Sequence, residues 1–140
     1  MFPEKKVWSL SKSKGLMDDF KGEQVVMCYG HFNIIHPGHI RYLEYAKNLG
    51  QKLIVVIQGD QMLMHSGNPH SFSANERALG LAWLQIVDRV VILDRWQLDM
   101  AIKLVMPQKL VLGKEFEGDR QGNLFNALQA LDEVSGEVVY

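Results

Sequence analysis

The sequence predicts an α/β fold in which helices cover both faces of a doubly wound, five-stranded parallel sheet. Short runs rich in β-branched residues alternate along the chain with longer segments of helical periodicity. The short runs are apolar at consecutive positions, which is typical of strands buried on both faces. A regular strand–helix–strand order favours parallel neighbours joined by crossover helices. Together these observations indicate three layers, α/β/α.

Each element has its own sequence signal. Five runs have the character of buried strands: residues 25–29, 53–57, 89–93, 109–112 and 137–140. Four segments between them have helical periodicity: residues 38–48, 74–85, 98–105 and 123–134. Gly50 and Pro107 follow the first and third of these segments, where helices commonly end. Before the first strand, Ser9 is expected to cap a short helix over residues 10–21. We expect a Rossmann-like arrangement.

The 140 residues correspond in length to one domain, with no internal repeat, low-complexity tract or linker. We divide the chain into an N-terminal lead-in, residues 1–24, and the domain proper, residues 25–140. No helix follows the last predicted strand, which would leave part of one sheet face uncovered. We therefore expect a domain that lacks its C-terminal helix, either because the chain is truncated or because a partner chain supplies the cover.

Composition excludes several classes of protein. With 47% hydrophobic and 22% charged residues the chain is neither disordered nor collagen-like, and its net charge of -1 is unlike that of a general nucleic-acid binder. The aliphatic run 53–57 is too short to span a bilayer, and the first six residues lack the apolar region of a signal peptide. We expect a cytoplasmic protein with no membrane or nucleic-acid partner. The single Cys28 lies in an apolar run and is expected to be a buried structural thiol.

The loop after the first strand is the first candidate site, because ligands of open parallel sheets bind at the carboxyl ends of strands. It holds three of the five histidines. Pro37 suits the first turn of a helix, which places His36 near the N-cap and His39 one turn later. Helix N-termini attract anions through unpaired N–H groups and a partial positive charge. Gly30 and Gly38 let the backbone approach a ligand closely. The loop therefore predicts a phosphate site.

A zinc site is the alternative for the same loop. His31, His36 and His39 have a spacing that allows their rings to converge on a metal. No fourth ligand is obvious in the sequence, so the phosphate site is favoured and no bound metal is expected there.

The pattern G-x-F-N-x-x-H-x-G-H, residues 30–39, resembles the signature of the nucleotidyltransferase superfamily. The chain is most similar to its cytidylyltransferase-like group, which includes glycerol-3-phosphate cytidylyltransferase and the adenylyltransferase domain of the bifunctional heptose enzyme. The similarity continues in order through VWSL (7–10), RYLEYAK (41–47), NER (75–77), VDRV (87–90) and LGKEF (112–116). It covers nearly the whole chain.

The resemblance implies transfer of CMP or AMP from CTP or ATP to a phosphorylated small molecule, with release of pyrophosphate. His36 and His39 match the paired catalytic histidines that stabilise charge on the phosphorus. The residues that the resemblance assigns to nucleotide binding are Tyr29, Gly30, His31, Phe32, Asn33, Gly38, Arg77 and Gly113. Asp60 and Lys114 are candidate contacts to the acceptor or to phosphate. Mg²⁺ is expected with the nucleotide, and the protein is expected to be a homodimer.

Several positions depart from the family pattern. Asn33 stands where the family usually has Asp, Gln85 stands where an arginine is frequent, and residues 62–70 contain no Lys or Arg. The family's Ser- and Thr-rich loop would follow Tyr140. These departures support an alternative, a weakened nucleotide-binding or interaction module of the same fold. A class I synthetase-like activating domain is a third, disfavoured hypothesis.

Three further residues have competing interpretations. Arg77 is equally consistent with a site residue and with a surface helix residue. Lys47 lies roughly 16 Å along the helix from His36, so we expect a solvated helix end rather than a phosphate contact. Trp83 falls in an apolar helical segment and is expected to pack.

Overall fold

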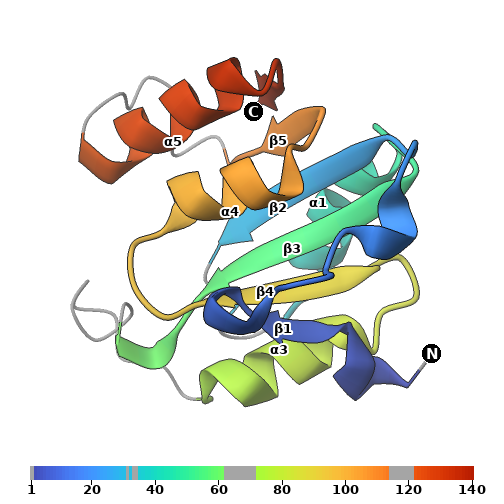
Figure 1. Ribbon diagram of the computed structural model, residues 1–140. Helices are drawn as coiled ribbons and strands as arrows, with labels where there is room; N and C mark the ends of the chain where they lie inside the picture. Colours follow the sequence, from blue (N-terminus) through green and yellow to red (C-terminus); the bar gives the residue numbers. More distant parts are fainter. Residues whose placement is uncertain (1, 31, 33–34, 62–71, 114–121) are drawn as a thin grey trace.

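A computed structural model of the chain describes residues 2–30, 32, 35–61, 72–113 and 122–140. The strands are β1 (Val7–Ser9), β2 (Val25–Gly30), β3 (Lys52–Gln58), β4 (Arg89–Leu93), β5 (Lys109–Val111) and β6 (Glu137–Val139). The α-helices in this part of the chain include α1 (Pro37–Lys47), α3 (Ala74–Ala82), α4 (Leu98–Val105) and α5 (Gly122–Glu133). The strands form one sheet in the order β1-β4-β3-β2-β5-β6, and all neighbours are parallel (Figure 1).

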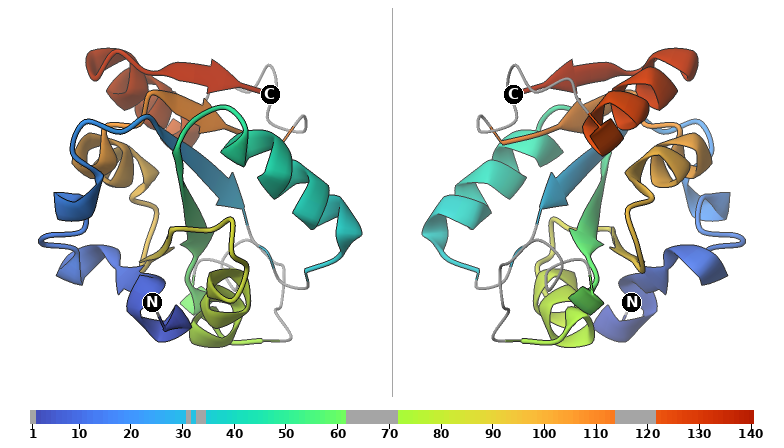
Figure 2. Two further views of the ribbon diagram at one scale, coloured as in Figure 1. Left: turned by 90° about the vertical axis from the view of Figure 1, so that its right-hand side faces the viewer. Right: turned by 90° about the vertical axis from the view of Figure 1, so that its left-hand side faces the viewer.

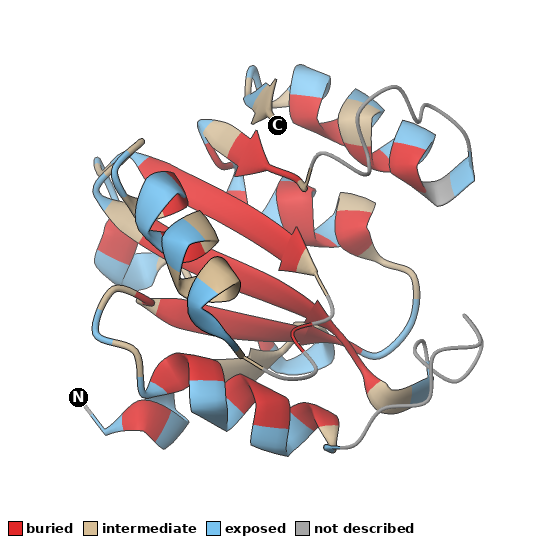
Figure 3. Cartoon of the chain, turned by 180° about the vertical axis from the view of Figure 1, so that it is seen from behind, coloured by how far each residue is buried: buried red, intermediate tan, exposed pale blue. Residues whose placement is uncertain are grey.

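The helices cover both faces of the sheet. In β2, Met27 and Tyr29 face the core that includes α4 and α5, while Val26 and Cys28 face the core that includes α1 and α3. Figure 2 shows α1 and α4 on opposite sides of the sheet. Figure 3 shows that the central strands are buried along most of their length and that each helix has one buried and one exposed face. The predicted three-layer, doubly wound α/β fold is confirmed.

The prediction of five strands is one too few. The additional strand is β1, which pairs in parallel with β4 at the edge of the sheet. With three residues and a polar Ser9, β1 is too short to give a clear strand signal. The lead-in therefore adds a strand to the sheet of the domain.

The predicted helix over residues 10–21 is wrong. The segment forms two short 3₁₀ turns instead, Leu10–Lys12 and Asp18–Phe20. Gly15 lies between them at φ +85°, a left-handed conformation that interrupts a right-handed helix. The Ser9 side chain makes no capping hydrogen bond.

The exposure of Cys28 and of Trp83 tests the packing predictions made for these two side chains. Cys28 is fully buried, as expected, and burial raises the pKa of its thiol to about 12, although a hydrogen bond with Tyr42 opposes the shift. Trp83 is 70% exposed, so its predicted packing role is wrong. The reason is that α3 ends at Ala82, earlier than predicted, and Trp83 is the C-cap.

Within the described ranges, no helix is long and apolar enough to cross a bilayer.

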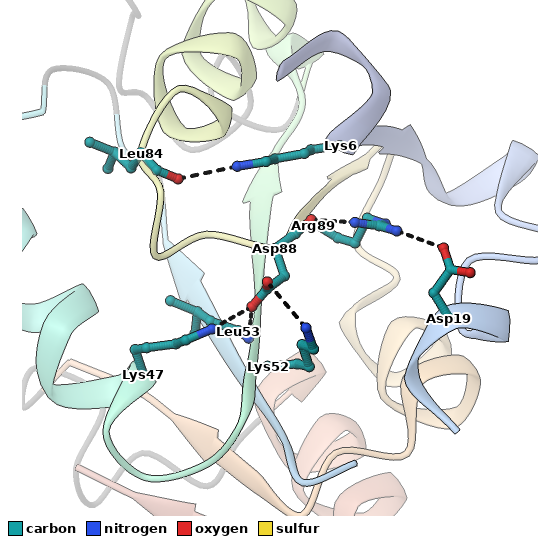
Figure 4. A network of polar contacts seen from close by, with 8 residues as sticks. All are labelled: Lys6, Asp19, Lys47, Lys52, Leu53, Leu84, Asp88 and Arg89. Carbon is teal, nitrogen blue, oxygen red and sulfur yellow. Dashed lines mark hydrogen bonds and ion pairs between the residues drawn. The ribbon is translucent and has the colours of Figure 1, made fainter. Parts of the chain in front are cut away.

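A network of charged side chains ties together the amino-terminal ends of β3 and β4 (Figure 4). Asp88 accepts hydrogen bonds from the Leu53 amide at 2.8 Å and from the Lys47 ammonium at 2.7 Å. Its neighbour Arg89 pairs with Asp19 of the lead-in at 2.9 Å. The VDRV motif therefore has a structural role at the edge of the sheet opposite to the candidate site.

Candidate functional site

The strand order reverses between β2 and β5. From β2 the chain proceeds to β3 and β4 on one side, and β5 and β6 lie on the other side. Cys28 and Val111 are partners in the β2–β5 register. Ligands of open α/β sheets bind outside the carboxyl ends of the strands at such a switch point. Gly30, at the end of β2, and Gly113, which follows β5, both lie at this edge.

Helix α1 begins at the switch point with two histidines that cap each other. His36 is the N-cap and Pro37 the first helical residue, as the sequence predicts. The His36 Nδ1 atom accepts a hydrogen bond from the Gly38 amide at 3.0 Å, and the His39 Nδ1 atom accepts one from the His36 amide at 3.2 Å. A reciprocal capping box is usually built from Ser or Thr with Glu or Gln. Here two imidazole rings accept the two capping hydrogen bonds instead.

The capping box assigns the acceptor nitrogen of the two rings. A nitrogen that accepts a hydrogen bond from an amide carries a lone pair, so Nδ1 is the acceptor in both rings and Nε2 is the ring position that can donate. The ring centroids are 4.1 Å apart. The His36 and Gly38 amides already donate to the imidazole rings. These two N–H groups are therefore not open to a ligand, whereas the sequence predicts unpaired N–H groups at this helix start. The helix dipole at this helix start favours an anion.

Two glycines and a strained phenylalanine shape the same region. Phe32 is buried and has φ +50°, an uncommon conformation for a bulky residue that clusters at functional sites. A Cβ at Gly30 would lie 2.9 Å from the Phe32 ring, and a Cβ at Gly38 would lie 2.7 Å from the His36 ring. The Phe32 and His39 ring centroids are 5.4 Å apart. The lack of a side chain at both glycines therefore permits this ring arrangement.

Tyr29 lies at the end of β2 but faces the other side of the sheet. Its hydroxyl accepts a hydrogen bond of 2.6 Å from the Gln58 side-chain amide, and its ring meets Trp96 edge-on at 5.5 Å. Burial raises the pKa of the Tyr29 hydroxyl, with Gln58 opposing the shift, so the group stays protonated. Its side chain belongs to the core of α4 and α5, whereas Phe32 belongs to the core of α1 and α3.

Arg77 and Asp60 lie together after β3. The Arg77 guanidinium is fully buried and donates to the carbonyls of Gln58 at 2.8 Å and Phe72 at 3.2 Å, and to the Asp60 carboxylate at 3.3 Å. Burial lowers the pKa of Arg77, and Asp60 opposes this effect. Asp60 also accepts from the Ala74 amide at 2.8 Å. The interpretation of Arg77 as a surface helix residue is therefore wrong, since it ties the end of β3 to the start of α3.

Three predicted site residues, His31, Asn33 and Lys114, lie outside the described residues. The three-histidine zinc alternative, which includes His31, is accordingly untested. In the part of the chain that the structure covers, no group of three or more His, Cys, Asp or Glu side chains is placed to hold a metal ion.

Tyr42 is a residue that sequence reasoning missed. Its hydroxyl donates a hydrogen bond of 2.7 Å to the Val111 carbonyl of β5. Its position three residues after His39, on the same face of the helix, is the signal that could have identified it.

Comparison with known proteins agrees with this geometry. A family model described as cytidylyltransferase-like matches residues 27–136. The bifunctional protein HldE of Haemophilus ducreyi is 36% identical over 103 residues, which cover 71% of this chain and 22% of that protein. The bifunctional protein HldE of Campylobacter fetus subsp. fetus is 35% identical over 119 residues, 84% of this chain and 26% of that protein. The chain thus spans roughly a quarter of the length of these relatives.

Solved structures show the same fold. The lipopolysaccharide core biosynthesis protein from Thermoplasma volcanium GSS1 superposes with a TM-score of 0.70 at 28% identity, covering 84% of this chain and 95% of that one. Pantoate-beta-alanine ligase from Francisella tularensis shares the fold alone, with a TM-score of 0.63 at 12% identity over 95% of this chain and 65% of that one. The family match spans the histidine loop, the switch point and the strands on either side of it. This chain belongs to the cytidylyltransferase-like family.

Proposed function

We propose that this chain is a nucleotidyltransferase domain that transfers CMP or AMP from CTP or ATP to a phosphorylated small molecule and releases pyrophosphate. The observation that carries the proposal is the mutually capped pair His36 and His39 at the start of α1, beside the β2–β5 switch point. Two imidazole N–H donors at a helix N-terminus suit phosphate oxygens.

In this reaction a phosphate oxygen of the acceptor attacks the α-phosphorus of the nucleotide. The new P–O bond forms as the bond between the α-phosphorus and the bridging oxygen breaks, and pyrophosphate leaves with that oxygen. The acceptor oxygen is already an anion, so no protein nucleophile is needed. The His36 and His39 Nε2–H groups would donate to phosphate oxygens as negative charge builds in the transition state.

The surrounding residues would hold the nucleotide. Gly30 and Gly113 would let the backbone approach it, and Phe32 would pack beneath it. His31, Asn33 and Lys114 remain proposed contacts. Arg77 would act by holding Asp60 and the end of β3 in place, because its guanidinium is enclosed by these partners.

Mg²⁺ would accompany the triphosphate. The described contacts of the histidine pair include backbone amides and the Phe32 ring. An ion that keeps several waters and is bound through phosphate oxygens would need few ligands from such residues. It would neutralise charge on the β- and γ-phosphates.

We propose a sugar phosphate as the acceptor class to screen first. The support is the similarity to a lipopolysaccharide core biosynthesis protein, together with the match to HldE proteins. We also propose that the protein is a homodimer, which light scattering on the purified protein would test, and that it is cytoplasmic. The competing proposal is a nucleotide-binding or interaction module without turnover, supported by the lack of Lys and Arg in residues 62–70.

Pyrophosphate release tests the proposal. The protein is incubated with Mg²⁺, CTP or ATP, and a panel of sugar and polyol phosphates. We expect release with one nucleotide and one acceptor class, and a loss of about a hundredfold or more in His39→Ala. Lys103→Ala, an exposed position on α4, is the control. Nucleotide binding without turnover across the panel would instead support the binding module.

A further inference from the structure

Tyr42 connects α1 to a strand that lies far away in the sequence. Its hydroxyl bonds the carbonyl of Val111, which is 69 residues further along the chain, at 2.7 Å. Val111 is the last residue of β5, and Gly113 follows two residues later. The hydrogen bond therefore joins the helix that carries the histidines to the strand on the other side of the switch point.

Tyr42 also meets the strand on the near side of the switch point. Val111 is in register with Cys28 of β2, and Tyr42 forms a hydrogen bond with the Cys28 thiol. The side chain thus lies over the pair of residues at which the strand order reverses. It contacts both strands that flank the switch point, β2 and β5.

A line of ring contacts leads from Tyr42 to the histidines. The Phe32 ring lies 6.3 Å from the Tyr42 ring and 5.4 Å from the His39 ring, between centroids. His39 in turn lies 4.1 Å from His36. Tyr42 is three residues from His39, roughly 4.5 Å along the helix axis, so a movement of the helix at Tyr42 is transmitted directly to the histidines.

We propose that Tyr42 is a positioning residue whose hydroxyl sets the place of the histidine pair relative to the carboxyl end of β5. Donors that act on a transition state must be held to within about 0.5 Å. Along the chain, α1 and β5 are separated by β3, α3, β4 and α4, and α1 packs on β2 and β3. The Tyr42–Val111 hydrogen bond is thus a direct contact between α1 and β5, across the switch point. The catalytic part of this inference rests on the proposed function, whereas the structural part does not.

The test compares Tyr42→Phe with Tyr45→Phe. The first removes the hydroxyl but keeps the ring that packs near Phe32, and the second removes a hydroxyl from a half-exposed tyrosine of the same helix. Tyr42→Met is a second variant without the hydroxyl. Circular dichroism establishes that each variant is folded.

The first readout does not depend on activity. Amide hydrogen exchange is measured at Gly38, whose N–H bonds His36. We expect exchange about fivefold to tenfold faster in Tyr42→Phe and Tyr42→Met than in the wild type, as for loss of one hydrogen bond, and no change in Tyr45→Phe. Equal exchange in the wild type and both Tyr42 variants would overturn the proposal.

The second readout is turnover with the acceptor that the pyrophosphate screen identifies. We expect kcat to fall between about tenfold and about a hundredfold in Tyr42→Phe, while KM for the nucleotide changes by less than about threefold. A variant that alters KM alone would contradict a positioning role. If the wild type shows no turnover, the proposed function fails, and amide exchange at Gly38 still decides whether Tyr42 positions the histidines.

Discussion

The Asp88 carboxylate and the Lys47 ammonium form an ion pair of 2.7 Å at the end of α1 remote from His36. Lys47 lies at the opposite end of α1 from His36, as expected, but its ammonium is paired with Asp88 rather than solvated. The Asp88 carboxylate also accepts a hydrogen bond from the Leu53 amide near the start of β3. The VDRV segment and the lysine of the RYLEYAK segment therefore meet in a structural contact.

Asp88→Asn is expected to destabilise the fold without weakening nucleotide binding. The substitution removes the ion pair and weakens the hydrogen bond to Leu53, which lowers the free energy of unfolding by about 1–3 kcal/mol. Urea unfolding measures the loss, and calorimetric titration with nucleotide measures affinity. Glu133→Gln, at an exposed position of α5, is the control. Normal stability with lost nucleotide binding would contradict this assignment of Asp88.

Gly38→Ala is expected to disrupt the histidine pair. A Cβ at this position would lie 2.7 Å from Cε1 of His36, closer than side-chain contacts allow, so the ring must move and the capping bond is lost. We expect nucleotide affinity to fall about tenfold or more. Gly80→Ala is the matched control, because a Cβ there meets only an ordinary contact of 3.5 Å with Ile35 and helix interiors favour Ala. Equal affinity in the two variants would show that the position of the His36 ring does not matter.

Arg77→Lys is expected to cost stability even though it keeps the charge. The guanidinium serves the Gln58 and Phe72 carbonyls and the Asp60 carboxylate together, a fork that an ammonium cannot reproduce. A loss of about 2–4 kcal/mol is expected from the unmet buried partners. Denaturant unfolding provides the measurement, with the exposed Arg41→Lys as its control. Unchanged stability with reduced nucleotide affinity would favour direct contact between Arg77 and nucleotide.

The buried thiol of Cys28 predicts a pH dependence of stability. Its pKa is raised from 9.0 to about 12 in the folded chain. Between these values the unfolded chain releases a proton that the folded chain retains, so stability falls as pH rises above 9 and is unaffected at neutral pH. Relative to Cys28→Ala, the wild type should lose about 2 kcal/mol between pH 8.5 and 10.5 in urea unfolding. A difference between the two proteins that stays constant over this range would show that the thiol titrates normally when folded.

The sequence predicts elements with a strong periodic signal well. The strand Arg89–Leu93 and the helix Leu98–Val105 have the predicted bounds. The strand is an apolar run that ends at Asp94, and the helix is an amphipathic run that is followed by Pro107. The strand Val7–Ser9 escapes prediction because its three residues gain their strand character from pairing with β4.

The candidate site is harder to predict from the sequence than the strands and helices are. The place of His36 and His39 at the start of a helix follows from Pro37, but their mutual capping depends on ring orientations that no spacing reveals. The burial of Arg77 depends on Gln58 and Phe72, at the two ends of the segment that joins β3 to α3. Such contacts exist only after the chain has folded.

Calorimetric titration with CTP and, separately, with ATP in the presence of Mg²⁺ tests the central claim most directly. The wild type is compared with a double variant, His36→Ala with His39→Ala, whose fold is checked by circular dichroism. We expect the wild type to bind one of the two nucleotides and the double variant to bind it at least about tenfold more weakly. Equal affinity in both proteins, or no binding of either nucleotide to the folded wild type, would contradict the assignment of the histidine pair as the phosphate site.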